Sequence, residues 1–189
     1  WFAGCSGRPA KKTRKSVGET GKTETSGGVE TMFSLKSSAF EDKQTMPAKY
    51  ANKGVAGGQN ISIPLSWENA PEGTKSFAIA VIDRHPIANN WVHWLVVDIS
   101  PEVTSLPEGA SNTSKMPAGS KELFTTYGSK GYGGPQPPPG SGVHDYEVTI
   151  YALRTERLGL AEKVPLNVFL SAVKENALGT AKLVGKFSR

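Results

Sequence analysis

The run FAIAVID, residues 77–83, decides the fold, because every position from Phe77 to Ile82 is apolar. A strand with one face in solvent alternates apolar and polar residues, whereas an unbroken apolar run is typical of a central strand buried on both faces. WVHWLVVDIS, residues 91–100, has the same character. The two runs therefore predict two central strands, each covered on both sides.

Shorter patterns around these runs predict the remaining strands. FSLKSSAF, residues 33–40, begins with strand-like alternation, and AKLVGKFSR, residues 181–189, is a candidate final strand. HDYEVTIYALRT, residues 144–155, alternates more regularly, so its apolar positions share one face of a strand. These positions are Tyr146, Val148, Ile150 and Ala152.

One helix is predicted late in the chain. Apolar residues recur at helical spacing between Leu166 and Ala177, Pro165 suits the first helical position, and Gly179 is expected to end the helix. With 21 glycines and 13 prolines in 189 residues, the chain favours a loop-rich architecture. The patterns together predict a mainly antiparallel β domain with one or two peripheral helices.

The positive charge of the chain is concentrated near its start. The net charge is +5, and residues 6–28 alone contain six basic and two acidic side chains, a net of +4. The remainder is therefore close to neutral. A nucleic-acid-binding domain carries its basic surface on the folded part, so this distribution argues against nucleic acid as a partner.

The first residues resemble the end of a bacterial lipoprotein signal. In WFAGCSG, residues 1–7, small residues precede Cys5, the position that is acylated in lipoproteins. Residues 1–31 are accordingly expected to form a lipidation site and a disordered basic tether, and residues 32–189 a single domain. The expected location is the cell envelope, through a lipid anchor. The alternative is an incidental cysteine in a disordered tail of a cytoplasmic protein.

A proline- and glycine-rich loop precedes the strand that starts near residue 144. GGPQPPPGSGVHDY, residues 133–146, contains four prolines and four glycines, a composition that excludes a helix and makes a poor strand. A flexible linker does not need so many prolines. We therefore interpret this loop as the rigid wall of a binding pocket that holds His144 and Tyr146.

Histidine, carboxylate and phenol side chains cluster around the same regions of the sequence. Imidazole and phenol groups and exposed glycine N–H groups can all donate hydrogen bonds, so such a cluster favours an anion such as phosphate or carboxylate. Asp83 is expected to orient a histidine by accepting from one ring nitrogen. The candidates are His85, His93, His144, Asp83, Tyr132 and Tyr146.

Three other interpretations of these residues are open. Each histidine could be structural, with both ring nitrogens bonded to backbone. The three histidines and Asp83 could bind zinc, although their spacing matches no metal motif. Ser141, His144 and an aspartate could form a hydrolase triad, although the sequence has no G-x-S-x-G elbow and a proline-rich loop is an unusual place for a nucleophile.

From about Phe33 to its C-terminus the sequence resembles the phosphatidylethanolamine-binding protein family, also called Raf kinase inhibitor-like proteins, and in particular its bacterial branch. FSLKSSAF, GQNISIPLSW, PEGTKSFAIAVID, WVHWLVVDI, YGGPQPPPGSGVHDY and AKLVGKF carry the resemblance through their order and spacing. The resemblance implies a mainly β fold in which a large central antiparallel sheet is flanked by a smaller sheet and helices. It also implies a pocket for phosphate-like head groups.

The resemblance also assigns the residues of that pocket. The family's Asp-Pro-Asp-x-Pro signature matches DRHP, with Asp83 and Pro86 at its ends and one residue fewer between them. The remaining matches are Trp91 and His93 in the pocket, Tyr132, Gly134, Pro137 and Pro138 in its wall, and His144 and Tyr146 as its closing pair.

The sequence departs from the family pattern at the rim. Arg84 replaces a proline and His85 stands near the second aspartate, so the mouth is expected to be more cationic than usual. Asp145 replaces the usual arginine, and its side chain is expected on the opposite face of the strand from His144 and Tyr146.

The sequence as a whole therefore predicts a binding module for a small anion or a phospholipid head group, with no metal and no cofactor. Regulation or inhibition of a partner protein is implied by the resemblance alone. The alternative is a hydrolase or lyase that uses His93 or His144 as a base. The oligomeric state is left open, with a homodimer as one alternative.

Overall fold

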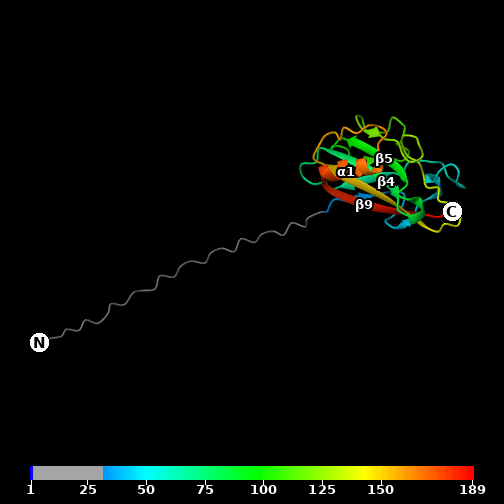
Figure 1. Ribbon diagram of the computed structural model, residues 1–189, viewed down its shortest axis with the longest axis horizontal. Coiled ribbons are helices and arrows are strands. Elements are labelled where there is room, and N and C mark those ends of the chain that lie inside the picture. Colours follow the sequence, from blue (N-terminus) through cyan, green and yellow to red (C-terminus); the bar gives the residue numbers. More distant parts are fainter. Residues whose placement is uncertain (2–31) are drawn as a thin grey trace. The chain divides into compact units, whose positions relative to one another are not determined.

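The computed structural model of the chain describes residues 32–189 together with Trp1. The regular elements of residues 32–189 are β1 (Ser34–Lys36), β2 (Gln44–Thr45), the 3-10 turn η1 (Ala48–Tyr50), β3 (Leu65–Glu68), β4 (Ser76–Asp83), the 3-10 turn η2 (Pro86–Ala88), β5 (Val92–Ile99), β6 (Ser105–Leu106), β7 (Lys121–Glu122), β8 (His144–Leu153), α1 (Leu166–Asn176) and β9 (Ala177–Phe187) (Figure 1). The expected lipidation site at Cys5 and the tether lie outside the described residues, apart from Trp1.

The strands form two sheets. The larger sheet has the order β2-β9-β8-β4-β5-β7, and the smaller has the order β1-β3-β6. This arrangement confirms the mainly β fold with a large and a small sheet. The large sheet is mixed rather than wholly antiparallel, because the short β2 pairs in parallel with β9 while its other pairings are antiparallel.

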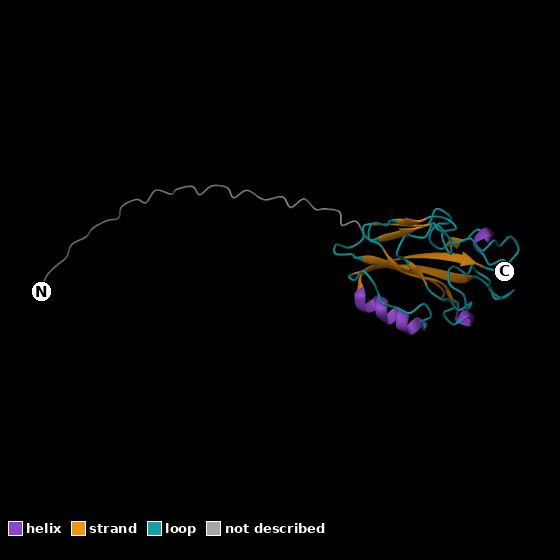
Figure 2. Ribbon diagram, turned by 90° about the horizontal axis from the view of Figure 1, so that it is seen from above, coloured by secondary structure: helices purple, strands orange, loops and turns teal. Residues whose placement is uncertain are grey.

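Strand β4 is apolar from Phe77 to Ile82 because each of its faces packs against a different layer. Phe77, Ile79 and Val81 belong to the core shared with the small sheet. The residues between them, Ala78, Ala80 and Ile82, belong to the core shared with α1. Figure 2 shows the longest helix on one side of the large sheet and further strands on the other. The three layers follow from the period-2 geometry of one fully buried strand.

The C-terminal helix ends earlier than the sequence predicts. Helix α1 begins at Leu166, one residue after Pro165, and ends at Asn176, while β9 starts at Ala177. Gly179 therefore lies inside β9 and does not terminate the helix. A Cβ at Gly179 would lie 2.8 Å from Cγ of Pro71, so close packing against a loop explains this glycine.

Within residues 32–189, no helix has the length and apolar composition that crossing a membrane requires.

We predict that Phe169 fixes α1 to the large sheet. Its side chain is fully buried, whereas its neighbour Val168 is 43% exposed. Phe169→Ala should lower the free energy of unfolding by about 3–5 kcal/mol because it leaves a cavity in the core. Val168→Ala is the matched control and should change it by less than about 1 kcal/mol. Urea denaturation measures both, and equal losses would show that the helix does not depend on this contact.

Candidate functional site

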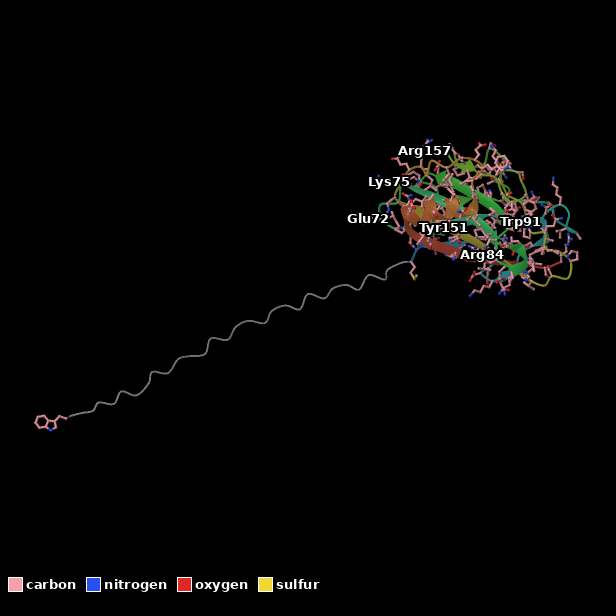
Figure 3. All side chains as sticks on the ribbon, in the orientation of Figure 1. Glu72, Lys75, Arg84, Trp91, Tyr151 and Arg157 are labelled. Carbon is pink, nitrogen blue, oxygen red and sulfur yellow. The ribbon has the colours of Figure 1, made fainter. Side chains whose placement is uncertain are left out.

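A cavity of about 300 Å³ opens where β4 ends and β8 begins. The turn η2, the start of β5 and the proline-rich loop complete its walls. Figure 3 shows Arg84 and Trp91, from the segment between β4 and β5, well away from Glu72 and Lys75, which precede β4. The residues lining the cavity are Asp83, Ile87, Ala88, Trp91, His93, Tyr127, Gln136, Pro137, Pro138, His144 and Tyr146.

The register of the large sheet brings the polar residues of this cavity together. Antiparallel pairing of β4 with β8 places Asp83 opposite Tyr146, two residues after His144. Alternation along β8 buries His144 and Tyr146 and leaves Asp145 exposed. The expectation that the side chain of Asp145 lies on the other face is confirmed.

Asp83 and His144 form a buried pair at the base of the cavity. Nδ1 of His144 lies 2.6 Å from Oδ2 of Asp83, and the two side chains are 1% and 5% exposed. The backbone N–H of His85 donates to the other carboxylate oxygen at 2.9 Å. The carboxylate therefore orients the imidazole, and both of its oxygens are hydrogen-bonded.

The second ring nitrogen of His144 points toward the proline-rich loop. Nε2 lies 2.9 Å from Oγ of Ser141, which also lies 2.7 Å from the carbonyl oxygen of Pro138. Ser141 thus contacts His144, and His144 contacts Asp83, which is the order of contacts in a hydrolase triad. Ser141 is not among the residues that line the cavity, and the Pro138 carbonyl competes for its proton.

His85 covers His144 rather than lining the cavity. The two imidazole rings stack with their centroids 3.9 Å apart and an interplanar angle of 12°. Nδ1 of His85 accepts a long hydrogen bond of 3.4 Å from the N–H of Ile87, at the start of η2. His85 therefore connects the turn η2 to the buried pair.

His93 is held in one orientation by the backbone of the wall. Its Nδ1 lies 2.6 Å from the carbonyl oxygen of Gly133, and its ring packs edge-on against Tyr127 and Tyr146. Burial lowers the pKa of His93 to about 4, although the contact with Gly133 opposes this shift. The ring is accordingly neutral at physiological pH.

The hydroxyl of Tyr146 is buried without a hydrogen-bond partner among the described residues. Burial, with a smaller contribution from Asp83, raises its pKa, so the phenol stays protonated. The carboxylate of Asp83 lies near enough to contribute to this shift, but it makes no hydrogen bond of good geometry to the Tyr146 hydroxyl. Since buried polar groups normally have partners, Tyr146 is the unusual polar group of the cavity.

The hydroxyl of Tyr127, the other phenol that lines the cavity, already has a hydrogen-bond partner. Tyr127 donates its hydroxyl proton to the carbonyl oxygen of Gly134 at 2.9 Å. Burial raises the pKa of Tyr127 to about 12. No motif in the sequence pointed to Tyr127, Ile87 or Ala88, because their places in the cavity depend on how the loops close over it. Gln136 lies in the loop that we interpret as the wall, but no motif singles out its side chain.

Three residues assigned to the pocket by resemblance lie behind it. Tyr132 packs on Trp94 and donates its hydroxyl proton to the carbonyl oxygen of Tyr50 at 3.0 Å. A Cβ at Gly134 would lie 2.2 Å from that same carbonyl oxygen, so the wall needs glycine for close approach. Pro86 is the first residue of η2. These residues shape the wall and the turn, and none of them lines the cavity.

The mouth of the cavity is less cationic than the sequence suggests. Arg84 bonds to Glu147 through Nε and Nη2 and to Asn90 through Nη1, so its charge is compensated away from the cavity. Ile87 and Trp91, which are 59% and 37% exposed, instead give the mouth an apolar edge.

No metal centre is evident within residues 32–189. No group of three histidine, cysteine, aspartate or glutamate side chains in that range is placed to hold a metal ion. The zinc interpretation of the three histidines therefore has no ligand set among these residues.

Comparison with known proteins relates the chain to one family. The family model described as phosphatidylethanolamine-binding protein matches residues 36–188. A UPF0098 protein of Methanothermobacter thermautotrophicus is 37% identical over 157 residues, which cover 83% of this chain and 99% of that protein. LppC of Mycobacterium tuberculosis, named as a lipoprotein candidate, is 32% identical over 159 residues, which cover 82% of this chain and 72% of that protein.

Solved structures give the same relationship. The crystal structure of Escherichia coli YbcL, described as a new member of the mammalian PEBP family, has a TM-score of 0.78 and 30% identity, covering 83% of this chain and 98% of YbcL. CT736 of Chlamydia trachomatis has a TM-score of 0.70 and 31% identity, covering 83% of this chain and 97% of CT736. Because the family model spans most of the chain and several relatives exceed 30% identity over most of it, the chain belongs to the phosphatidylethanolamine-binding protein family.

Proposed function

We propose that the protein is a binding module for a small anionic ligand, such as a phosphorylated or carboxylated head group. The observation that carries the proposal is the buried hydroxyl of Tyr146, a protonated donor with no partner among residues 32–189, on a residue that lines the cavity. Leaving a buried polar group unpaired is unfavourable. A ligand oxygen would supply the missing acceptor.

The carboxylate of Asp83 does not argue against an anion at this site. Its two oxygens accept from His144 and from the backbone N–H of His85, so its charge is partly compensated. The nearby basic side chain, Arg84, is paired with Glu147 on the outer surface. Recognition would therefore rest on directed hydrogen bonds more than on net charge, as in other sites that combine an apolar lining with a few placed polar groups.

The apolar mouth favours a ligand that has an apolar part next to its anionic group. Ile87 and Trp91 line the cavity and are also exposed. Val143, which precedes His144, is 56% exposed. A regulated partner protein that contacts Ile87 and Trp91 would cover the mouth of the cavity. The description of the matching family, phosphatidylethanolamine-binding protein, supports this ligand class.

Tyr146→Phe should separate ligand binding from stability. The substitution removes only an oxygen that has no partner, so the free energy of unfolding should stay the same or rise. Affinity for phenyl phosphate should fall about tenfold, since one hydrogen bond to a charged group is lost. Isothermal titration calorimetry and urea denaturation measure the two effects.

Tyr132→Phe is the matched control, because it removes a hydroxyl that is bonded to Tyr50 and lies behind the wall. It should lower the free energy of unfolding by about 1 kcal/mol and leave affinity unchanged. Loss of affinity in Tyr132→Phe alone, with Tyr146→Phe unaffected, would contradict the proposed site.

A lipid anchor at Cys5 belongs to the same proposal. The small residues before Cys5 and the lipoprotein name of one relative support it. Expression of the full gene product in a bacterial host should give membrane-associated protein, and Cys5→Ser should release it. Equal fractions of the two forms in the membrane pellet would exclude the anchor.

The contacts of Ser141 support esterase activity as a second candidate function. Its Oγ lies 2.9 Å from His144, which is paired with Asp83. If Ser141 is a nucleophile, the protein should hydrolyse 4-nitrophenyl acetate, and Ser141→Ala and His144→Ala should each remove at least about 99% of the rate. Turnover that survives in Ser141→Ala would exclude this function.

A further inference from the structure

The orientation of His93 fixes which of its nitrogens faces a ligand. Nδ1 lies 2.6 Å from the carbonyl oxygen of Gly133, and a carbonyl can only accept, so Nδ1 carries the proton. In a neutral imidazole Nε2 is then an acceptor. No described residue donates a hydrogen bond to Nε2, and His93 lines the cavity.

The surroundings of His93 keep its ring neutral. The side chain is almost fully buried, and burial is the main reason that its pKa is lowered. The groups that face it are the carboxylate of Asp83, the imidazole of His144 and the protonated phenols of Tyr127 and Tyr146. Asp83 favours a charged ring and His144 opposes it, and the two phenols carry no charge.

Among the buried side chains that line the cavity, the Tyr146 hydroxyl is therefore a donor without a partner, and Nε2 of His93 is an acceptor that is available to a ligand. The rings that carry them are 5.0 Å apart between centroids. We propose that the cavity selects an oxyanion that is itself protonated, such as the monoanion of a phosphomonoester, with Tyr146 donating to one ligand oxygen and His93 accepting from the ligand O–H. This inference rests on the proposed function and names the ligand class more narrowly.

The proposal distinguishes ligands that have the same charge and nearly the same shape. A phosphomonoester loses its second proton at a pKa of about 6, so phenyl phosphate is mainly a protonated monoanion at pH 5.5 and mainly a dianion at pH 8. Phenyl sulfate carries one negative charge and no proton at either pH. With phenyl sulfate or the phosphate dianion, a ligand lone pair would face the lone pair of Nε2.

The experiment is calorimetric titration of the unaltered protein with phenyl phosphate and phenyl sulfate at pH 5.5 and pH 8. At pH 5.5 phenyl phosphate should bind at least about tenfold more tightly, because an acceptor without its donor is unfavourable in a buried site. The ratio of the two affinities should fall toward 1 at pH 8. Phenyl sulfate controls for changes in the protonation of the protein between the two pH values, since protonation of any histidine strengthens the binding of both anions.

Two variants test whether His93 causes the preference for phenyl phosphate over phenyl sulfate. His93→Phe should bring the affinity ratio close to 1 at both pH values, whereas His85→Phe, whose ring lies outside the cavity lining, should preserve it. If His93→Phe does not fold, the affinity ratio measured on the unaltered protein still tests whether the cavity selects a protonated oxyanion.

A ratio near 1 at pH 5.5, or tighter binding of phenyl phosphate at pH 8 than at pH 5.5, would overturn the inference and leave anion binding intact. Absence of binding by both probes at both pH values would instead overturn the proposed function and the inference together.

Discussion

The hydrogen bond between His144 and Asp83 connects the cavity to the central sheet. Asp83 ends β4 and His144 begins β8, and the two strands are paired, so the 2.6 Å contact depends on the register of the most buried part of the fold. A one-residue slip would turn His144 out of the core. The pair also supports the loops, because Asp83 binds the backbone of His85 and His144 contacts Ser141. The pair therefore connects the sheet to two of the segments around the cavity.

Close backbone packing provides the second constraint. The carbonyl oxygen of Tyr50 accepts from Tyr132 and leaves no room for a side chain at Gly134. The carbonyl oxygens of Gly133 and Gly134 in turn accept from His93 and Tyr127. The wall thus accepts the Nδ1 proton of His93 and the hydroxyl proton of Tyr127, and it leaves the Tyr146 hydroxyl without a partner. An apolar lining with few uncommitted polar atoms suits selective binding of a small polar group.

Much of the fold could be predicted from the sequence, because a strand buried on both faces, such as β4, is apolar along most of its length. The alternation of residues in β8 likewise predicts that His144 and Tyr146 lie on one buried face of the strand. Other features of the structure depend on tertiary contacts that cannot be predicted from local sequence patterns. Gly179 packs against Pro71 inside β9 instead of ending α1, and Arg84 pairs with Glu147 across strands instead of facing the mouth. The sequence shows that residue 179 is a glycine and residue 84 an arginine, but it does not show which distant residues they contact.

The central claim is that a protonated oxyanion fits between Tyr146 and His93. A crystal structure of the protein grown with phenyl phosphate at pH 5.5 tests it most directly. The account predicts the phosphoryl group in the cavity, with one oxygen about 2.5–3.0 Å from the Tyr146 hydroxyl and another about 2.7–3.2 Å from Nε2 of His93. A phosphoryl group bound elsewhere, or one in the cavity with neither contact, would contradict the account.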